Sequence, residues 1–391
     1  MKKILFDLTK TQPLNGTKFH GGGKYGIAVF KKIVELAPDK IAAYYNESLY
    51  IDSVVMKLCQ ENNIPVVKKS ERSVTDAAKM FGGVLYSPLN DSAYLKDSEV
   101  HAIVTIHGLR VLEMPYDKYE ECYAVGCGTI VRFLKKSLLY KYILERKRKK
   151  KFQKDLTQKR ITFSKENLSF VTVSNHSKYS LLSFFPELRE KNIKVFYSPS
   201  TIDDSVSLDD YKNPYGKYFL IVSGNRWLKN SVRAMLALDE LITEHPDFEG
   251  IVVVTGLKEI NEVDVKIKNL DRFVFLEYVE ENQLKGLYRH ANLLVYPSLN
   301  EGFGYPPLEA MHEGCPVVAS AIASIPEICG DAVMYFNPFS TAEIKMRILQ
   351  MENSETKMHF IKKGIEREKI IAKKQAEDLE SFAEYILSYI K

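Results

Sequence analysis

The sequence has little cysteine and no long apolar run. Five cysteines are scattered through 391 residues, and Cys122 and Cys127 have no second Cys/His pair at zinc spacing beside them. We therefore expect buried free thiols in a reducing compartment rather than disulfides or a metal site. No segment has the apolar length that a membrane-spanning helix needs. The opening residues 1–7 meet a charge too early for a secretion signal, so a cytoplasmic protein is expected.

Charge is unevenly distributed along the chain. The formal net charge is +5, but residues 132–160 hold 13 Lys and Arg against Glu145 and Asp155. Apolar residues alternate with these cations: Phe133, Leu134, Leu138, Leu139, Tyr142 and Ile143. Because basic amphipathic helices bind anionic lipid, peripheral attachment at the inner face of the cell membrane is one interpretation. A solvated helix face packed in the N-terminal domain is the alternative, and nucleic-acid binding is not expected because no nucleic-acid module is present.

Short apolar runs alternate with longer helical patterns throughout. Strands are predicted at 3–8, 83–87, 102–106, 170–173, 193–197, 218–222, 251–255, 273–276, 293–296, 316–319 and 333–336. Helices are predicted at 24–37, 50–62, 132–150, 175–184, 230–245, 281–290, 307–313, 341–351 and from about 356. This alternation predicts an α/β protein with two Rossmann-like, doubly wound domains, each built on a parallel sheet covered on both faces.

A domain boundary is expected in the polar, turn-rich stretch 198–216. The N-terminal domain would then span residues 1–200 and the C-terminal domain residues 201–374. An amphipathic helix at about 375–391 is expected to pack back on the first domain. Ligands of open α/β sheets bind outside the carboxyl ends of the strands, so the residues that follow each strand, facing an interdomain cleft, are the candidates for a site.

A Gly-x-Gly loop and a Pro-Pro helix start separate two carboxylates, Glu301 and Glu309. Pro307 suits the first helical position, which would put Glu309 in the first turn and Glu301 on the preceding loop. Gly302 and Gly304 leave backbone N–H groups open to a ligand at a helix N-terminus, where anionic groups bind. Carboxylates accept hydrogen bonds from a sugar diol, so the site suits a nucleotide-sugar. For Glu309, a helix-dipole partner without further function is the alternative.

Arg226 and Lys229 follow the predicted strand 218–222 and flank a helix N-terminus. An Arg fork matches phosphate oxygens and Lys adds a compact charge, so together they could neutralise a diphosphate. The chain has no Asp-x-Asp pair of the kind that holds a divalent ion on a nucleotide. Solvated surface cations are the alternative, but the position after a strand favours function.

The first half of the chain offers two further candidates. Gly22 and Gly23 end a run of three glycines before a predicted helix, where backbone N–H groups can approach phosphate or sugar closely. Their spacing is not Gly-x-Gly-x-x-Gly, and a plain loop is the alternative. His107 ends the predicted strand 102–106, where an imidazole could donate to a sugar or a phosphate. A structural histidine with satisfied hydrogen bonds is the alternative there.

These stretches, in this order, resemble the retaining glycosyltransferases of family 4, which have the GT-B fold. The resemblance is densest from 218 to 338 and rests on the segments 223–230, 273–279, 297–311, 316–320 and 325–332. The Glu-x7-Glu element with its flanking residues is the most specific part. The first half matches through the glycine loop, Thr105-Ile106-His107 and Val173-Ser174. The Gly-Asn-Arg-x-x-Lys-Asn form at 224–230 and the Thr-Ile-His element resemble bacterial mannosyl- and rhamnosyltransferases of surface polysaccharide synthesis.

The resemblance implies a role for each candidate. Arg226 and Lys229 would stabilise the diphosphate leaving group, Glu301 would hold the transferred sugar, and His107 would lie against the sugar and phosphate. Those four would be the catalytic residues. The nucleotide-sugar site would contain the following residues: Gly22, Gly23, Gly224, Arg226, Lys229, Val279, Leu284, Glu301, Gly302, Phe303, Gly304 and Glu309. Glu309 would accept from the ribose hydroxyls, and the base would pack near Val279 and Leu284.

The implied activity is metal-independent transfer of a hexosyl group, without a cofactor, to a glycan or lipid-linked acceptor. GDP-mannose is the favoured donor, with dTDP-rhamnose or a UDP-sugar as alternatives. The first domain would bind the acceptor and the second the nucleotide-sugar. A non-catalytic glycosyltransferase-like subunit and a nucleotide-sugar epimerase of the same fold are the competing interpretations. Two positions depart from many relatives: Gly108, where they have Asp after the histidine, and Glu277, where they have Gly.

Overall fold

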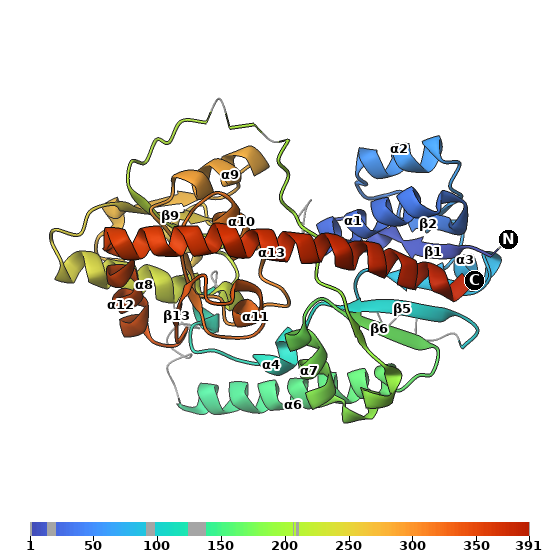
Figure 1. Ribbon diagram of the computed structural model, residues 1–391. Coiled ribbons are helices and arrows are strands. Elements are labelled where there is room, and N and C mark those ends of the chain that lie inside the picture. The colour runs from blue at the N-terminus through green and yellow to red at the C-terminus, as the bar shows by residue number, and fades with distance from the viewer. Residues whose placement is uncertain are drawn as a thin grey trace. The chain divides into compact units, whose positions relative to one another are not determined.

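Two parallel sheets organise the protein, seen here in a computed structural model (Figure 1). The structure describes residues 2–13, 21–90, 98–123, 138–205, 207–208 and 211–390, and the side chains of 138–141 are not described. The chain divides into two units. The first unit comprises Met1–Leu109, Asp155–Thr201 and Ala372–Lys391, and the second comprises Arg110–Lys154 and Ile202–Ile371. The segment Arg110–Lys154, expected within the N-terminal domain, thus groups with the second unit.

The first unit contains a seven-stranded sheet of order β3-β2-β1-β4-β5-β6-β7. Its strands are β1 (Ile4–Asp7), β2 (Ile41–Tyr45), β3 (Val66–Lys68), β4 (Val84–Ser87), β5 (His101–Ile106), β6 (Leu168–Thr172) and β7 (Lys194–Val195). Every pairing is parallel. The winding direction reverses between β1 and β4, which makes the sheet doubly wound. β2 and β3 were not predicted from the sequence.

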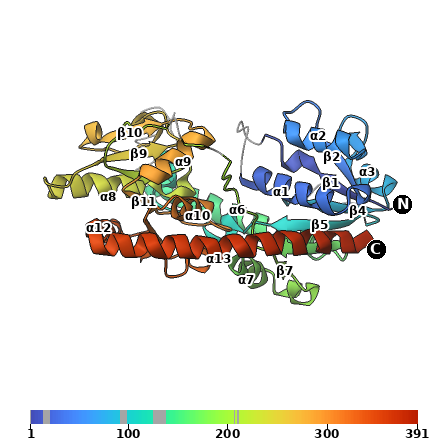
Figure 2. The same cartoon turned by 45° about the horizontal axis from the view of Figure 1, so that its top comes forward.

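Helices cover the strands of the first unit because both faces of a parallel sheet must be buried. They are α1 (Gly21–Leu36), α2 (Ser53–Glu61), α3 (Val74–Met80) and α7 (Asn175–Phe184). α1 and α2 contact each other and lie side by side in both views (Figure 1 and Figure 2). Two longer helices, α6 (Leu138–Phe163) and α13 (Ser354–Leu387), contribute residues to both units.

The second unit contains a six-stranded parallel sheet of order β10-β9-β8-β11-β12-β13. Its strands are β8 (Tyr218–Ile221), β9 (Ile251–Thr255), β10 (Phe273–Leu276), β11 (Leu293–Tyr296), β12 (Val317–Ser320) and β13 (Met334–Phe336). Its helices are α4 (Arg110–Glu113), α8 (Ser231–Glu244), α9 (Glu281–His290), α10 (Tyr305–His312), α11 (Ile325–Cys329) and α12 (Thr341–Glu352). All six strands were predicted, and the expected doubly wound α/β fold is confirmed in both units.

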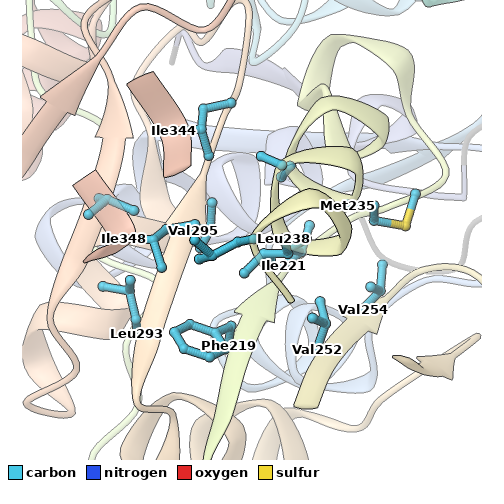
Figure 3. Close-up of a cluster of buried hydrophobic side chains, with 14 of the residues drawn as sticks. Phe219, Ile221, Met235, Leu238, Val252, Val254, Leu293, Val295, Ile344 and Ile348 are labelled. Atoms are coloured by element: carbon cyan, nitrogen blue, oxygen red, sulfur yellow. The ribbon is translucent and has the colours of Figure 1, made fainter. Parts of the chain in front are cut away.

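A buried apolar cluster fixes the central strands of the second unit (Figure 3). Alternate residues of β8, including Phe219 and Ile221, point to one face of the sheet, as the two-residue period of a strand requires. Leu238 of α8 and Ile344 of α12 pack against that face, and both are fully buried. The ends of β8 and β11 are therefore held rigidly, which positions the loops that follow them.

Two helices differ from the sequence prediction in their bounds. α6 runs to Phe163 rather than to residue 150, and residues 124–137, which include Cys127 and the start of the predicted helix, lie outside the described residues. α10 begins at Tyr305 rather than at Pro307, so both prolines lie in its first turn. Gly314, just after its end, has a φ of 72°, the conformation expected of a glycine at that position.

Candidate functional site

The winding of the second sheet reverses between β8 and β11, and the predicted site residues follow these two strands. Arg226 and Lys229 come after β8, whereas Glu301 comes after β11. The carboxyl edge at such a reversal is where open α/β sheets bind ligands, because the two loops diverge there. The loops are tied together by backbone contact, since Leu299 N–H donates to the Leu228 carbonyl at 2.7 Å.

Gly224 shapes the loop after β8. A Cβ at this position would lie 2.8 Å from Val254 Cγ1, so a larger residue would force the loop away from β9. The Gly224 N–H donates to the Thr255 carbonyl at 2.6 Å, and the Ser231 hydroxyl donates to the Gly224 carbonyl at 2.7 Å. The structure thus gives Gly224 a packing role next to the site. Arg226 is exposed, and its Nη2 donates to Ser223 Oγ at 2.9 Å.

Asn230 links three loops around Lys229. It is buried and adopts the left-handed conformation, with a φ of 57°. Its Nδ2 donates to the carbonyls of Pro297 at 3.0 Å and Pro338 at 2.9 Å. These bonds fix the end of the short helix Trp227–Lys229 against the loop that carries Glu301.

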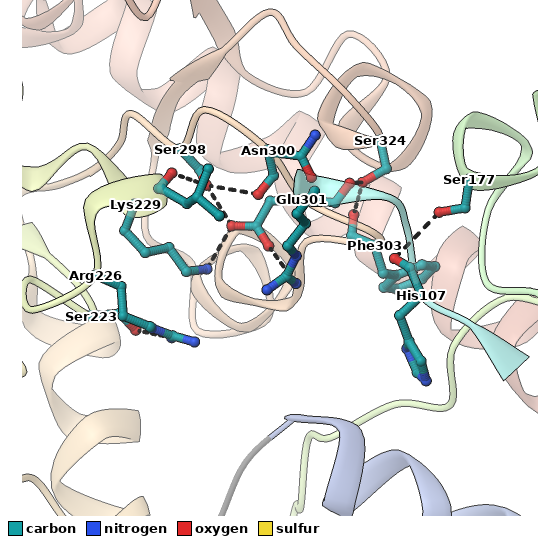
Figure 4. Close-up of polar contacts among 12 residues, drawn as sticks. His107, Ser177, Ser223, Arg226, Lys229, Ser298, Asn300, Glu301, Phe303 and Ser324 are labelled. Carbon is teal, nitrogen blue, oxygen red and sulfur yellow. Dashed lines mark hydrogen bonds and ion pairs between the residues drawn. The ribbon is translucent and has the colours of Figure 1, made fainter. Parts of the chain in front are cut away.

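Glu301 is buried, and one of its oxygens is fully engaged (Figure 4). Oε1 accepts from Lys229 Nζ at 2.6 Å, from the Tyr296 hydroxyl at 2.7 Å and from Ser298 Oγ at 2.6 Å. Oε2 forms an ion pair with Arg110 Nη2 at 3.9 Å, which is too long for a hydrogen bond. Among the described residues, none donates a hydrogen bond to Oε2, so this oxygen keeps its capacity to accept from a ligand hydroxyl.

The charges around Glu301 explain its ionisation. Burial opposes the charged form, but the charges of Lys229 and Arg110 outweigh it and, with hydrogen bonds from Lys229 and Ser298, lower the pKa of the carboxyl to about 2. For Lys229, burial lowers the pKa of the amine; Arg226 and Arg110 act in the same direction, and Glu301 opposes them. The cluster therefore holds more positive charge than Glu301 neutralises.

Residues 302–304 lead from Glu301 into α10. The Ser324 hydroxyl donates to the carbonyls of Glu301 at 3.0 Å and Phe303 at 2.8 Å, and these bonds fix the loop between Glu301 and α10. Gly304 precedes the helix with a φ of 107°, a conformation that L side chains rarely adopt. Gly302, Phe303 and Gly304 thus stand at the N-terminus of α10, as predicted from the sequence.

Glu309 lies one turn deeper in α10 than expected. Because the helix starts at Tyr305, Glu309 is its fifth residue, and the prediction of a first-turn position was wrong. The Tyr288 hydroxyl, from α9, donates to Glu309 Oε2 at 3.0 Å. Val279 and Leu284, predicted to pack near the base, are half-buried and flank the start of the same helix α9.

The remaining predicted residues belong to the first unit. His107 follows β5, its Nε2 lies 2.9 Å from the Pro88 carbonyl, and its ring packs edge-on against Tyr25 with 4.6 Å between centroids. Tyr25 is on α1, and Gly22 and Gly23 are in the first turn of that helix rather than on a loop. Gly108 has a φ of 134°, a conformation that Asp and other L residues rarely adopt, which favours glycine at this position.

Sequence reasoning missed several residues of the Glu301 environment. Tyr296 and Ser298 precede Glu301 by a few positions. Their hydroxyls, so close in the sequence, could have indicated that they donate hydrogen bonds to the Glu301 carboxylate. Ser324 follows the next strand, β12, at the same edge of the sheet. Arg110 lies far away in the sequence, and no local pattern indicated its contact with Glu301.

The described part of the chain lacks two kinds of feature. Over the residues with a described position, no group of three or more His, Cys, Asp or Glu side chains is arranged to hold a metal ion. None of the helices in those same ranges has the length and hydrophobicity needed to cross a membrane.

Known proteins with similar sequences are glycosyltransferases. Residues 209–367 match the family described as "Glycosyl transferases group 1". The O-antigen chain mannosyltransferase RfbU of Salmonella typhimurium is 31% identical over 172 residues, 43% of this chain and 46% of that protein. The O-antigen chain mannosyltransferase B of Escherichia coli is 31% identical over 193 residues, 46% of this chain and 50% of that protein. The chain thus matches about half the length of these relatives.

Solved structures share the fold over nearly the whole chain. HepE of Anabaena, solved in complex with UDP and glucose, superposes with a TM-score of 0.64 at 15% identity and covers 99% of this chain and 100% of that one. WaaG, a glycosyltransferase involved in lipopolysaccharide biosynthesis, gives a TM-score of 0.58 at 14% identity and covers 99% of both chains. The expected GT-B fold is confirmed, and within it residues 209–367 match the glycosyl transferases group 1 family.

Proposed function

We propose that this protein is a retaining glycosyltransferase of family 4 that transfers a hexosyl group from a nucleotide-sugar to a hydroxyl of a glycan or lipid-linked acceptor. One observation carries the proposal. Glu301 is anchored through Oε1 at the reversal point of the second sheet and keeps Oε2 for a ligand hydroxyl, beside an excess of positive charge. A nucleotide-sugar presents the two groups that this arrangement suits, sugar hydroxyls and a diphosphate.

The cations would act mainly on the leaving group. As the glycosidic bond breaks, negative charge grows on the diphosphate, and Arg226 and Lys229 stabilise that charge more in the transition state than in the ground state. Lys229 is held in place by Glu301 at 2.6 Å, so its position is set before the substrate arrives. We infer front-side attack by the acceptor, assisted by the leaving phosphate, because the site requires no carboxylate nucleophile.

Other residues of the second unit would recognise the rest of the donor. Glu301 Oε2 accepts from hydroxyls of the transferred sugar, and the N–H groups of Phe303 and Gly304 face the donor at the N-terminus of α10. Glu309, oriented by Tyr288, accepts from the ribose hydroxyls. Val279 and Leu284 offer an apolar surface to the base. His107, Gly22 and Gly23 lie in the first unit, and their roles toward sugar, phosphate and acceptor stay predictions.

The donor sugar is proposed from the relatives. RfbU and the E. coli protein are named as O-antigen mannosyltransferases, so GDP-mannose is the favoured donor and a bacterial surface polysaccharide the favoured product. dTDP-rhamnose and UDP-sugars are the alternatives that a donor panel separates. We propose a cytoplasmic protein, because nucleotide-sugars are made and consumed on that side of the membrane.

The basic helix α6 supports peripheral attachment to an anionic membrane. Lys147, Lys150 and Lys151 are exposed, and so are Tyr142 and Ile143. Arg148 is directed away from these side chains: its Nη2 lies 3.0 Å from Glu120 Oε2, and its guanidinium covers the Tyr116 ring at 3.6 Å. The described part of α6 thus exposes several cations together with Tyr142 and Ile143 but has no separate apolar face, so the proposed attachment rests mainly on the charge of the helix.

Donor turnover tests the enzymatic proposal. The purified protein is incubated with GDP-mannose, dTDP-rhamnose and several UDP-sugars, and release of nucleoside diphosphate is measured. We expect slow release from one donor, and loss of that release in Glu309→Ala but not in Glu355→Ala, an exposed glutamate on α13. Conversion of the sugar without release of diphosphate would instead identify an epimerase. Absence of turnover and of nucleotide binding would favour a non-catalytic subunit.

Vesicle flotation tests the membrane proposal. We expect flotation with vesicles that contain anionic lipid at low salt and none with neutral vesicles. Replacing Lys147, Lys150 and Lys151 by Glu should abolish it. The control carries the same change at exposed lysines of α13: Lys362, Lys369 and Lys373. Equal flotation of both triple variants would show that α6 is not the membrane-binding element.

A further inference from the structure

A segment from the first half of the chain supplies side chains to the donor side of the second unit. We call residues Arg110–Tyr123 the strap. Its far end is anchored on α8, where the Tyr123 hydroxyl lies 2.8 Å from Ser231 Oγ and accepts from the Val232 N–H at 3.1 Å. The helix α8 begins directly after Lys229 and Asn230, so the strap is attached next to the proposed diphosphate site.

A buried ion pair holds the middle of the strap. Asp117 Oδ2 accepts from Arg233 Nη2 at 2.7 Å, and the two side chains are 6% and 2% exposed. Arg233 also donates to Asn230 Oδ1 at 2.7 Å and lies over the Tyr119 ring at 4.6 Å. Removing one partner of such a pair leaves a buried charge, so the strap is a fixed part of the unit rather than a loose loop.

The near end of the strap points at Glu301. Arg110 Nη2 lies 3.9 Å from Glu301 Oε2, and Glu113 Oε2 accepts from Asn300 Nδ2. Asn300 is buried, and among the described residues its Oδ1 has no hydrogen-bond donor. The strap therefore holds the residue directly before Glu301 in place.

The 3.9 Å ion pair with Glu301 leaves the hydrogen-bonding capacity of Arg110 unused among the described residues. The Arg110 side chain is 46% exposed, and the described residues form no hydrogen bond with its guanidinium. A guanidinium has five donors in a planar fork that matches phosphate oxygens. Even with Glu113 counted beside Glu301, the cations Arg110, Arg226 and Lys229 outnumber the carboxylates of the cluster. An anionic ligand would neutralise the excess positive charge of this cluster.

We propose that Arg110 binds the diphosphate of the nucleotide donor as a third cation beside Arg226 and Lys229, delivered by the strap. This inference rests on the proposed function and adds a ligand-contacting residue that lies outside residues 209–367. Glu113 and Asp117 are positioning residues, since they act by holding the strap against Asn300 and Arg233. Arg110 contributes binding energy that a lysine reproduces only partly, because a lysine lacks the bidentate fork.

Calorimetric titration with nucleotides tests the proposal. GDP, UDP and dTDP, with their monophosphates, are titrated into the wild-type protein, Arg110→Ala, Arg110→Lys and Arg289→Ala. Arg289 is the matched control, because it is similarly exposed, lies in the same unit and pairs with Glu313 at 2.6 Å. We expect Arg110→Ala to weaken diphosphate binding about ten- to a hundredfold, the range of a charged hydrogen bond, with a smaller loss for the monophosphate.

The variants separate the possible failures. Arg110→Lys should fall between wild type and Arg110→Ala, and Arg289→Ala should bind as wild type does. Unchanged diphosphate affinity in Arg110→Ala, with an unchanged thermal unfolding midpoint, would overturn the assignment of Arg110 and leave the proposed function intact. A wild-type protein that binds none of the three diphosphates would overturn the proposed function, and this inference with it.

Discussion

The candidate residues of the two units are held in different ways. In the second unit, Glu301 is buried and the Lys229 side chain is 11% exposed, and hydrogen bonds join these charged groups to each other and to Tyr296. In the first unit, His107 is half-buried, lies within hydrogen-bonding distance of a backbone carbonyl and packs against the Tyr25 ring. Charge fixed in a buried network suits a group whose charge grows during the reaction, as a leaving diphosphate does. A half-buried imidazole suits neutral hydroxyls, so donor activation should depend on the second unit.

The largest expected effect comes from removing Lys229. Lys229→Ala takes a fixed cation from the leaving group and leaves the buried Glu301 with one partner fewer. We expect turnover of the nucleotide-sugar to fall by about 10²–10³, the range for a preorganised charged donor. The measurement is the rate of nucleoside diphosphate release, with Lys345→Ala as control, since Lys345 pairs with Glu240 and Glu244 outside the site. Turnover near the wild-type rate would contradict a role for Lys229 in leaving-group stabilisation.

Acid should weaken the second unit through Glu301. The folded state lowers the pKa of this carboxyl from the model-peptide range of about 4.3 to about 2, so its ion pairs stabilise the fold above pH 5 and are lost between pH 5 and 2. The shift corresponds to about 3 kcal/mol of unfolding free energy. Urea unfolding of the wild type and Glu301→Gln at several pH values measures this. The difference between their free energies of unfolding should shrink as the pH falls from 5 to 2.

A pH-independent difference between these two proteins would show that the Glu301 charge does not contribute as described. Glu343→Gln is a suitable control, because Glu343 lies on α12 away from the Lys229 cluster and accepts from the Asn337 N–H at 2.8 Å. Its unfolding curve should follow the wild type in the range where Glu301→Gln departs from it.

The hydroxyls that anchor Glu301 should have a smaller effect. Tyr296→Phe removes a 2.7 Å hydrogen bond to Oε1 without changing the shape of the buried ring. A hydrogen bond to a charged group is worth about 1.5–3 kcal/mol, so we expect turnover to fall by about tenfold or more as the carboxylate loses its fixed orientation. Steady-state kinetics measure it, with Tyr86→Phe as a buried-tyrosine control in the first unit. Equal loss in both variants would point to a general packing effect.

His107 should give the smallest effect on the donor. His107→Gln keeps a hydrogen-bonding group near the Pro88 carbonyl and removes the ring from Tyr25. We expect turnover to fall about tenfold, as for one hydrogen bond, while nucleoside diphosphate affinity stays unchanged. Turnover and calorimetric titration together test the contrast between the units. A large loss of diphosphate affinity would show that the first unit also carries donor binding.

The strands of the second sheet were predictable because each is a continuous apolar run, and β8, β11 and β12 are buried along their whole length. β2 and β3 were missed because Ala42 and Ala43 weaken the apolar run of β2, and because β3 offers only Val66 and Val67 before Lys68. Arg226, Lys229 and Glu301 follow strands, and the winding of the sheet brings such positions to one edge. The contact between Arg110 and Glu301 depends on how two distant segments pack, which no local pattern encodes.

A crystal structure of the protein with the nucleoside diphosphate that it binds tests the central claim most directly. We expect diphosphate oxygens about 3 Å from the side chains of Arg226 and Lys229, the usual hydrogen-bond distance, with the ribose at Glu309. Glu301 should keep its three donors on Oε1. A nucleotide bound elsewhere, or a diphosphate that contacts neither cation, would contradict the assignment of the second unit as the donor site.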